Sequence, residues 1–573
     1  METDVLVLGG GGAGARAAIA ADDAGRRCLI VTKGPVAHSG ATPMACPSYQ
    51  AAAAMEDPRD SAETAFFDTS QEGRDLGDDD LIHALVTEAT DRALDLERYG
   101  VKFRKTDGRF FQVTHPGQSF PRNLVIKGCG YSMMFQMRRE LERRPGIALM
   151  EDAIATRLLV RDGRVIGAAV LDLRSGEVAD IRAGAVIIAT GGYPELWLRT
   201  DTTPELTGDG QALALAAGAE LVDMEMMLWY PTCLTAPEEI AGTLVQYEGL
   251  VNPDYCGGAF LNARGDPFLP PGRLPVRDVM MKRMFTEIDE GRGTATDGLY
   301  IDLRQSAKPM SEIRRILRKL DSLPYHNLAD LNIDIAEQPI EVAPATHYTL
   351  GGVRIDAWGR TSVPGLYACG EAAGNVHGAN RTSGNALTET QVFGRRAGLT
   401  AAQEAVVPTG PAAEAPEVAD ERARVSALFV AGPGYALRPR EVKQALKQVM
   451  HEHLGHHRDE RGMSRALDQI SELRRDRLPR VRVTAGAVFN YELQEALEAT
   501  AMLDVAETVV LSGLERRESR GHHWRSDFPG SEPGDLRHTT VRRVGDRLQL
   551  GRAAVRRIDR SVLATEGNVA NVV

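Results

Sequence analysis

The sequence predicts an α/β fold followed by a helical domain, and three patterns support this. Residues 4–8 form a short buried-strand pattern that runs into a glycine-rich turn and then an alanine-rich stretch ending near Gly25. Apolar strands that end in glycine recur at residues 185–192 and 365–371. Apolar residues at helical spacing fill residues 492–511. Strands and helices joined by glycine turns are typical of a Rossmann-like nucleotide-binding domain.

The N-terminal turn fits the G-x-G-x-x-G pattern that holds a pyrophosphate. Gly9 allows the tight turn, Gly11 lets phosphates approach the backbone, and Gly14 lets the helix pack closely on the strand. Gly12 and Ala13 open the helix, whose N-terminus faces the anion. Alone the match is weak, but the strand before it and the helix after it are the required context.

The second predicted strand, residues 28–32, departs from the usual dinucleotide pattern. It ends in Thr32 and Lys33, where an NAD site carries an acidic residue for the ribose hydroxyls. Each later cluster, at residues 190–192 and around Glu371, would by itself be interpreted as an ordinary turn. Together, such widely separated contacts favour FAD, which is long enough to be held at both ends.

Composition and charge argue against several other classes of protein. The chain has 573 residues, a formal charge of −12, and no apolar run near the ~20 residues that span a bilayer. The negative charge opposes nucleic-acid binding. The N-terminus lacks the features of a signal peptide, so we expect a cytoplasmic protein, or one held at a membrane only through a partner.

The cysteines and a histidine-rich segment do not predict a metal site. The six cysteines are too scattered for an iron–sulfur cluster or a zinc site. The histidines at 451, 453, 456 and 457 have no acidic or thiol arrangement beside them in the sequence. We therefore expect these histidines to lie on a solvated helical surface, and no metal to be bound.

Eight short motifs lie in order along nearly the whole chain. They are Ser39-Gly40-Ala41-Thr42, Thr207-Gly208-Asp209-Gly210, Glu248-Gly249, Arg277-Asp278, His347 to Gly352, Gly370-Glu371, Gly378 to Arg381 and Arg517 to Gly521. In this order they resemble the flavoprotein subunits of succinate dehydrogenase and fumarate reductase, with L-aspartate oxidase as a soluble relative. The Thr-Lys pair in place of the ribose acid is also similar to that family's variant of the fingerprint.

The resemblance implies an FAD-binding domain that is interrupted by a capping domain and followed by a helical domain. The expected boundaries are 1–235 and 349–412 for the FAD-binding domain, 236–348 for the capping domain, 413–530 for the helical domain and 531–573 for a surface tail. Pro408, Pro411 and Pro416 mark a linker before the helical domain.

The resemblance also implies hydride exchange between flavin N5 and the carbon–carbon bond next to a carboxylate. Arg381 matches the arginine that binds this carboxylate, and His347 the histidine that braces it. Arg277 matches the proton donor, with Glu248 as the relay. A relay is needed because a free guanidinium has a pKa above ~12. Taken alone, Arg277 fits a solvated or ion-paired arginine better, and His347 can also be a core histidine.

The residues expected to hold FAD come from all of the glycine-rich segments. They are Gly9, Gly11, Gly12, Ala13, Gly14, Thr32, Lys33, Ser39, Gly40, Ala41, Thr42, Thr190, Gly191, Gly192, Asp209, His347, Glu371, Arg381, Asn385, Ala386 and Leu387. Membrane-linked relatives attach FAD covalently through the histidine of a Ser-His-Thr motif. This chain has Gly40 at that position, and its nearest histidine is His38. We expect noncovalent FAD, with covalent attachment through His38 as the alternative.

Two aromatic residues depart from the family pattern on the side expected to bind the distal end of the substrate. Tyr230 stands where succinate and fumarate enzymes carry histidine, and Tyr247 where they carry threonine. Two phenols add bulk and remove a potential cation. We therefore expect a small carboxylate substrate other than plain succinate or fumarate, with an aromatic, amide-like or extended distal end, acted on by a carboxylate dehydrogenase or enoate reductase.

Three other functions remain open. An enzyme similar to L-aspartate oxidase would attack a carbon–nitrogen bond. A flavoprotein subunit would work with an iron–sulfur or other electron-transfer partner, because this chain lacks cluster-binding cysteines. A noncatalytic FAD-binding scaffold would have a decayed substrate pocket, which the presence of Arg277, His347 and Arg381 disfavours.

Overall fold

The computed structural model describes most of the chain. The described residues are 1–270, 274–318, 328, 330–406, 415–429, 436–532 and 536–559. Pro408 and Pro411 of the expected linker, and residues 560–573 of the expected tail, lie outside the described residues.

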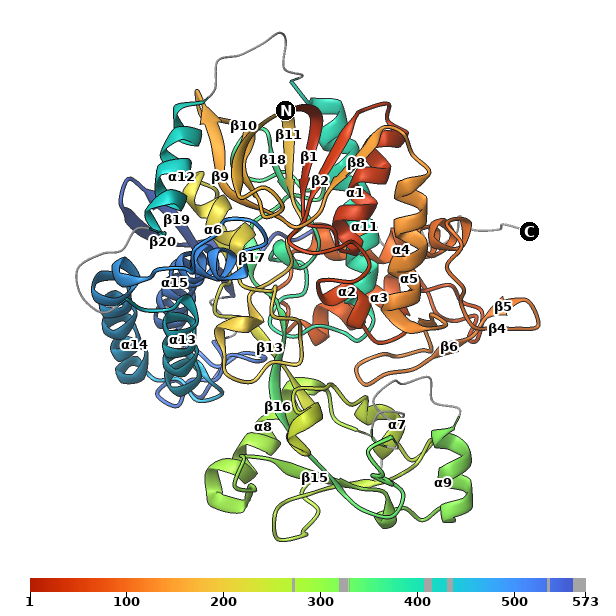
Figure 1. Cartoon of the computed structure of the whole chain (residues 1–573). Helices are drawn as coiled ribbons and strands as arrows, with labels where there is room; N and C mark the ends of the chain where they lie inside the picture. Colours follow the sequence, from red (N-terminus) through yellow and green to blue (C-terminus); the bar gives the residue numbers. More distant parts are fainter. Residues whose placement is uncertain are drawn as a thin grey trace.

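A mainly parallel sheet lies in the upper part of the molecule as drawn in Figure 1. Its strands are β1 (Glu2–Leu8), β2 (Cys28–Val31), β8 (Ile147–Met150), β9 (Ala153–Arg161), β10 (Arg164–Asp172), β11 (Glu177–Ile188) and β18 (Leu366–Ala368). The order is β8-β2-β1-β11-β10-β9, with β18 beside the end of β11. Strands β8, β2, β1, β11 and β18 run parallel. Their carboxyl ends therefore meet at one edge, where ligands bind in such sheets.

Helices α1 (Gly12–Asp23) and α11 (Asn385–Glu404) pack closely together beside this sheet. A Cβ added to Gly398 would lie 2.2 Å from the carbonyl oxygen of Ala17, so only glycine fits this crossing. The close approach brings two segments nearly 400 residues apart to the same sheet edge.

Smaller elements surround this core. The helices are α2 (Ala41–Met44), α3 (Ala62–Glu72), α4 (Asp79–Arg98), α5 (Cys129–Glu142) and α6 (Asp209–Ala216). The short strands are β3 (Ser48–Gln50), β4 (Lys105–Thr106), β5 (Arg109–Phe110), β6 (Gln112–Val113) and β7 (Asn123–Val125). Short helical turns are η1 (Pro194–Leu196), η2 (Glu238–Ile240), η3 (Ile288–Arg292), η4 (Leu303–Gln305), η5 (Gly370–Ala372), η6 (Leu473–Arg477) and η7 (Leu478–Arg480).

A second, smaller domain is connected to the core through the long strands β13 and β16 (Figure 1). Its sheet has the order β13-β16-β15-β14, and α7, α8 and α9 flank it. The bounds are β13 (Met227–Leu234), α7 (Tyr247–Val251), β14 (Ala259–Leu261), α8 (Arg277–Glu287), β15 (Leu299–Asp302), α9 (Met310–Leu317) and β16 (Ile340–Thr349). Strand β13 ends just before the first boundary that the sequence suggested for a capping domain, at 235, and its partner β16 crosses the second, at 348–349.

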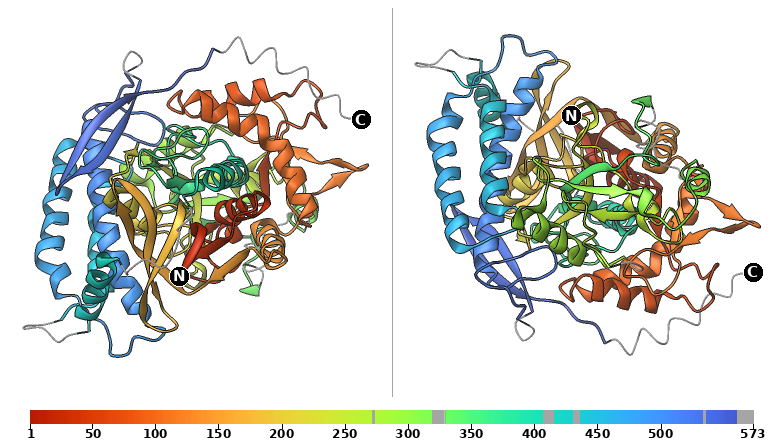
Figure 2. Two further views of the ribbon diagram at one scale, coloured as in Figure 1. Left: turned by 90° about the horizontal axis from the view of Figure 1, so that it is seen from above. Right: turned by 90° about the horizontal axis from the view of Figure 1, so that it is seen from below.

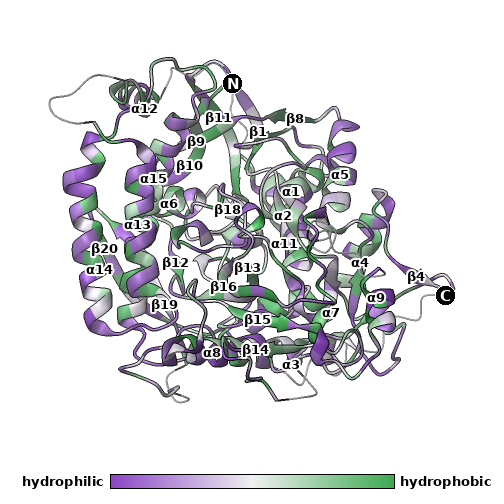
Figure 3. Ribbon diagram, turned by 60° about the horizontal axis from the view of Figure 1, so that its bottom comes forward, coloured by the Kyte–Doolittle hydropathy of each residue, from purple (hydrophilic) through white to green (hydrophobic). Residues whose placement is uncertain are grey.

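Helices α12 (Pro416–Ala427), α13 (Pro439–Leu454), α14 (Glu460–Glu472) and α15 (Tyr491–Glu515) follow α11. Both views of Figure 2 place the helices drawn in blue on the side of the molecule opposite the β4–β5 hairpin. Figure 3 shows hydrophobic colour concentrated in inner strands such as β11 and β15, and hydrophilic colour on outer helices such as α14. Among the described residues, no helix is long and apolar enough to cross a membrane.

The segment after residue 531 is more than a surface tail. Strands β19 (Arg537–Val544) and β20 (Arg547–Ala554) form a hairpin that extends the pair β12 (Leu221–Val222) and β17 (Gly352–Val353). His538 on β19 is fully buried, with Nδ1 2.5 Å from Asp223 and Nε2 3.1 Å from Asp78. The two carboxylates outweigh the effect of burial and raise the pKa of His538 to about 9. A buried cation paired on both sides thus fixes the hairpin to the core.

The expectation of a solvated surface for the histidine-rich segment is wrong for two of its members. His453 is only 5% exposed. His456 stacks on Phe285, with ring centroids 3.9 Å apart, and lies 2.8 Å from a carboxylate oxygen of Asp289. His457 contacts the other oxygen of Asp289. His456 and His457 join the helical domain to α8 and η3, a long-range contact that spacing along the chain does not reveal.

Candidate active site

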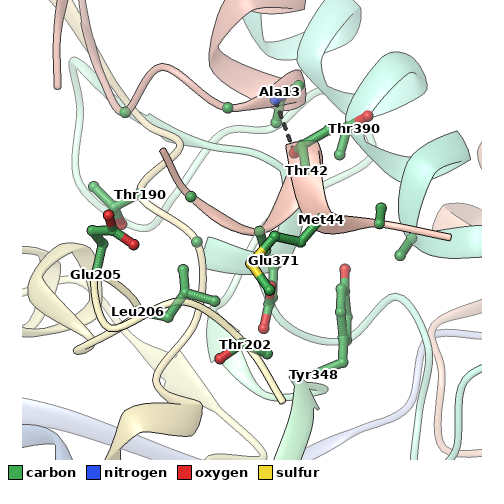
Figure 4. Close-up of a pocket in the computed structure, with 18 of the residues that line it drawn as sticks. Ala13, Thr42, Met44, Thr190, Thr202, Glu205, Leu206, Tyr348, Glu371 and Thr390 are labelled. Carbon is green, nitrogen blue, oxygen red and sulfur yellow. Dashed lines mark hydrogen bonds between the residues drawn. The ribbon is translucent and has the colours of Figure 1, made fainter. Parts of the chain in front are cut away.

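A cavity of about 240 Å³ lies at the carboxyl edge of the mainly parallel sheet. Its walls come from the turns after β1, β2 and β11, from the segment after β18, and from β13, β16 and α8. Figure 4 shows Thr42 and Thr390 near Ala13 on one side of it, and Glu205 and Leu206 on another. The cavity therefore joins the nucleotide-binding edge to the second, smaller domain.

The glycine turn after β1 is shaped for an anion. Gly9 has a φ of +110°, and a Cβ there would lie 2.2 Å from the carbonyl oxygen of Ala189. Helix α1 begins at Gly12, and its N-cap residue Gly11 provides no side-chain cap. The Gly12 N–H donates to Thr42 Oγ1 at 3.1 Å, which holds the short helix α2 against the turn. Open N–H groups at a helix N-terminus bind phosphate, so the turn fits a pyrophosphate group.

Most residues predicted to hold a cofactor line this cavity. They are Gly9, Gly11, Gly12, Ala13, Thr32, Lys33, Ser39, Gly40, Ala41, Thr42, Thr190, Gly191, Asp209, His347, Glu371, Arg381, Ala386 and Leu387. Gly14, Gly192 and Asn385 are not among the lining residues. A Cβ on Gly14 would meet the Gly9 carbonyl oxygen at 1.9 Å, so Gly14 serves the packing of α1 on β1. Asn385 instead donates to Thr69 Oγ1 at 3.5 Å.

Lys33 lines the cavity, but its ammonium is held by carboxylates. It forms ion pairs with Asp209 and, at 2.8 Å, with Glu498 of α15, and donates to Thr207 Oγ1 at 2.8 Å. Burial acts to lower the pKa of Lys33, yet the two carboxylates outweigh it and raise the pKa. Lys33 and Asp209 therefore join the mainly parallel sheet to the helical domain, in addition to forming part of the cavity wall.

Glu371 presents a buried carboxyl group to the cavity. Its Oε1 accepts a hydrogen bond of 2.9 Å from the backbone N–H of Thr349. A Cβ on Gly192 would lie 2.4 Å from the same oxygen, so this glycine makes room for the carboxyl group. Burial raises the pKa of Glu371 to about 7. With this pKa, both the protonated and the ionised form of Glu371 are populated near pH 7. The carboxyl group can therefore form a hydrogen bond with a hydroxyl group of a ligand.

His347, on β16, is oriented by a buried carboxylate. Its Nδ1 lies 3.0 and 3.1 Å from the two oxygens of Asp201. Burial lowers the pKa of His347, Arg381 and Arg277 add to this, and Asp201 offsets only part of it. The neutral imidazole therefore donates Nδ1–H to Asp201, which leaves Nε2 as an acceptor until an anion raises the pKa.

Arg381 is a buried guanidinium with unused hydrogen-bonding capacity. Its side chain lies over the ring of Tyr348, with the guanidinium carbon 4.7 Å from the ring centroid. Nη1 donates to the carbonyl of Thr382 at 3.2 Å, and Nε has no partner among the described residues. Burial and the positive charge of Arg277 lower the pKa of Arg381 to about 10. A buried cation with a free N–H group is a site for an anion.

Arg277 begins α8 and faces the same cavity. Its Nη2 lies 3.5 Å from Glu248 Oε1 and 3.3 Å from Ser383 Oγ, and Nη1 has no partner among the described residues. Burial would raise the pKa of Glu248, but His115 and Arg277 lower it to about 2. Tyr247 and Glu248 outweigh burial and raise the pKa of Arg277. The pair is thus a buried cation and anion held in their charged forms.

Aromatic rings enclose this end of the cavity. Tyr230 donates to Glu248 Oε2 at 3.2 Å, and its ring centroid lies 4.9 Å from that of His347. The guanidinium carbon of Arg277 is 5.1 Å from the Tyr230 centroid, and the centroid of the Tyr247 ring is 5.5 Å from that of Tyr230. Both tyrosines are buried, but only Tyr230 lines the cavity, and Tyr247 packs behind it.

Several functional residues were missed by the sequence reasoning. Asp201 orients His347, and His115 Nδ1 lies 3.8 Å from Glu248 Oε1. Ser383, which accepts a hydrogen bond from Arg277, was also missed, although it follows Arg381 closely in the sequence. Neither Asp201 nor His115 sits in a glycine-rich motif, so only folding brings them to the site. His38, the alternative point of covalent attachment, is not a lining residue of the cavity, although Ser39 and Gly40 are.

Comparisons with known proteins agree with this geometry. The family model "FAD binding domain" matches residues 4–387, and "Fumarate reductase flavoprotein C-term" matches residues 443–561. A relative from Methanothermobacter marburgensis, named as one of the subunits of fumarate reductase (CoM/CoB), is 39% identical over 96% of this chain and 99% of its own. An L-aspartate oxidase from Streptomyces coelicolor is 32% identical over 95% and 92% of the two chains.

A solved structure of a fumarate reductase chain is similar to this chain over nearly its whole length. An Escherichia coli quinol fumarate reductase chain has a TM-score of 0.88 and 28% identity, and the match covers 97% of each chain. The predicted α/β fold with its C-terminal helical domain is confirmed, and so is the prediction of FAD.

Proposed function

This chain belongs to the family of fumarate reductase and succinate dehydrogenase flavoprotein subunits, and from that premise we propose a substrate and a role for each site residue. It is an FAD-dependent oxidoreductase of the type that acts on CH–CH bonds. We propose that its substrate is a small acid that reacts at the carbon–carbon bond next to the carboxylate. The supporting observation is that Arg277, His347 and Arg381 line the same cavity as the glycine turns.

The residues of this cavity fit FAD at two places. The open N-terminus of α1, at Gly11 and Gly12, would hold the pyrophosphate, with Thr42 keeping the turn in place. Glu371 would accept a hydrogen bond from a hydroxyl group of the cofactor. When bound, FAD supplies the atom that accepts or donates the hydride. Because Gly40 replaces the attaching histidine and His38 does not line the cavity, we propose that FAD is bound noncovalently.

Arg381 and His347 would bind the substrate carboxylate. The free Nε–H of Arg381 can donate to one carboxylate oxygen directly. His347 can donate through Nε2 only when it is protonated, because Nδ1–H is already directed at Asp201. An anion beside the imidazole raises its pKa, so binding of the acid would be accompanied by uptake of a proton.

Arg277 would donate the proton to the carbon next to the one that receives the hydride. Its raised pKa makes it a poor acid in the resting enzyme, so donation requires close contact with the reacting carbon and prompt reprotonation. Glu248 holds the guanidinium in place and stays ionised, since its pKa is about 2. Tyr230 fixes the other oxygen of Glu248.

The two tyrosines favour a substrate with one carboxylate and a distal end that is aromatic, amide-like or extended. Tyr230 offers an aromatic surface on the cavity wall where a second carboxylate would need a cation, and Tyr247 packs behind it with ring centroids 5.5 Å apart. Fumarate is the second candidate, favoured by the relative from M. marburgensis whose name includes fumarate reductase. L-Aspartate is the third, favoured by the relative from S. coelicolor.

Steady-state assays of the FAD-loaded protein with fumarate, succinate, L-aspartate and arylacrylates test this proposal. Preferred turnover of an arylacrylate supports it, efficient turnover of fumarate or succinate selects the second candidate, and peroxide release with L-aspartate selects the third. No turnover of any acid, with dye or flavin reductants, contradicts the assigned class of substrate.

An electron-transfer partner is proposed on a separate observation. The relative from M. marburgensis bears the name of one component of a larger enzyme, and this chain matches 99% of its length. We therefore propose that electrons pass between this chain and an iron–sulfur or other electron-transfer protein. Activity with soluble dyes that is absent with cellular reductants, and restored by a co-purified partner, supports this role.

A further inference from the structure

A second, much smaller cavity lies behind Arg277. Its volume is about 10 Å³, which is room for one water molecule. Its walls are formed by Glu72, Pro116, Tyr247, Glu248, Arg277, Arg381 and Ser383. Arg277 Nη1 and Arg381 Nε are buried and have no hydrogen-bond partner among the described residues. A polar space of this size, with several donors and acceptors around it, is the kind of site that holds an ordered water.

Glu72 is the one carboxyl group on the wall of this cavity to which the proposed reaction assigns no role. It is the last residue of α3 and only 5% exposed. Asn380 donates to its Oε1 at 2.9 Å. A Cβ on Gly117 would lie 2.5 Å from Oε2 of Glu72, so the carboxyl group packs where only glycine leaves room for it. Its position is therefore fixed by packing as well as by hydrogen bonding.

Burial and nearby charges together raise the pKa of Glu72. Burial raises the pKa of Glu72, and the Asp278 carboxylate raises it further. Arg74, Arg277 and the hydrogen bond from Asn380 act in the opposite direction, and the pKa is about 7. Across the small cavity it also faces Glu248 and Arg381.

We propose that Glu72 is the proton source for Arg277, through one water in the small cavity. This inference rests on the proposed function, because it supplies the proton that Arg277 would give to the substrate. Glu72 and Arg277 line the same one-water space, and Nη1 of Arg277 has no other partner among the described residues.

The proton transfer balances in two steps. When Arg277 gives a proton to the substrate carbon, it becomes a neutral guanidine. The carboxylic acid of Glu72 then gives its proton to the water, and the water gives one of its own to the guanidine. Glu72 is left as a carboxylate, and solvent reprotonates it from the side of Arg74, whose side chain is 30% exposed and pairs with Asp278.

Glu248 is less suited to this task, although it is closer to Arg277 by contact. In the resting enzyme the pKa of Glu248 is about 2, so at pH 7 Glu248 is ionised and holds no proton to give. With a pKa of about 7, roughly half of the Glu72 side chains carry one. Glu248 therefore positions Arg277, and Glu72 carries the proton.

The variant E72Q tests this inference, with E421Q as the matched control because Glu421 is also 5% exposed but lies on α12, away from the site. The readout is reduction of the best acid from the substrate panel, as a function of pH. In the wild type, turnover should fall as the pH rises through about 7, because the acid form of Glu72 is consumed. E72Q should lose about 100-fold in kcat with little change in KM, and should lose this pH dependence. E72D should recover part of kcat, and E421Q should behave as the wild type.

Two results would overturn the inference. If E72Q has the kcat and pH profile of the wild type, Glu72 is not on the proton route. If E72Q changes KM alone, Glu72 contacts the substrate and does not supply the proton. If no acid is reduced, the proposed function fails, and infrared titration then decides on Glu72 separately. A carboxyl band that titrates near pH 7 and is lost in E72Q supports a protonatable Glu72, and an unchanged spectrum contradicts it.

Discussion

Replacing Arg277 with glutamine separates the catalytic role of this residue from its role in stability. In the wild type, Glu248 has a pKa of about 2, against an ordinary value of 4.5. A depression of this size corresponds to about 3 kcal/mol of stabilisation. Because the folded-state pKa is depressed, this stabilisation is present above pH 4.5 and is lost as the pH falls through about 2. His115 and Arg277 share in this effect, so at pH 7 R277Q should lose only the part of the roughly 3 kcal/mol that Arg277 contributes, while Glu248 keeps its buried charge.

The double variant R277Q/E248Q provides the decisive comparison. Removing the unpaired carboxylate should recover part of the lost stability, with a coupling of about 1–3 kcal/mol measured by thermal or urea unfolding at pH 7. Turnover should stay at least about 100-fold below the wild type in both variants, while the flavin absorbance is retained. The reasoning is refuted if R277Q keeps substantial turnover, or if the stability losses of R277Q and E248Q simply add in the double variant.

Four further predictions concern the cofactor, the substrate and the fold. Gly9→Ala should abolish flavin absorbance in the purified protein, because its Cβ would lie 2.2 Å from a carbonyl oxygen; Gly163→Ala, with a positive φ but open space, should keep it. Calorimetry in buffers of different ionisation enthalpy should detect uptake of about one proton when the wild type binds an acid, and none in His347→Gln. The contribution of His538 to stability, about 3 kcal/mol, should be full below pH 6.5 and disappear as the pH rises through about 9, and unfolding of His538→Gln should lack this dependence. Acid precipitation should release the flavin into the supernatant, and flavin left in the pellet would instead indicate attachment through His38.

The parts of the site that the sequence predicted are those carried by short, local patterns. Gly9 and Gly14 follow a strand and open a helix, so their chemistry is contained within a few residues. Arg277 and Arg381 were found only through motifs that resemble those of a family. Local physics alone does not distinguish either arginine from an ordinary ion pair.

The parts that were missed depend on distant segments. Asp201 reaches His347 across 146 residues, and Asn380 reaches Glu72 across 308. Asp201 lies outside the motifs, and the motif that contains Asn380 gives no indication of Glu72, because each pairing exists only once β16 and α3 are in place. The same holds for β19, whose short alternating pattern gave no reason to expect that it would join β12 near the core.

A crystal structure of the FAD-loaded protein with the best acid from the substrate panel tests the central claim most directly. We predict the acid's carboxylate within hydrogen-bond distance of Arg381 and of Nε2 of His347, with Arg277 facing its carbon–carbon bond. An acid bound elsewhere, or one whose carboxylate contacts neither Arg381 nor His347, would contradict the account.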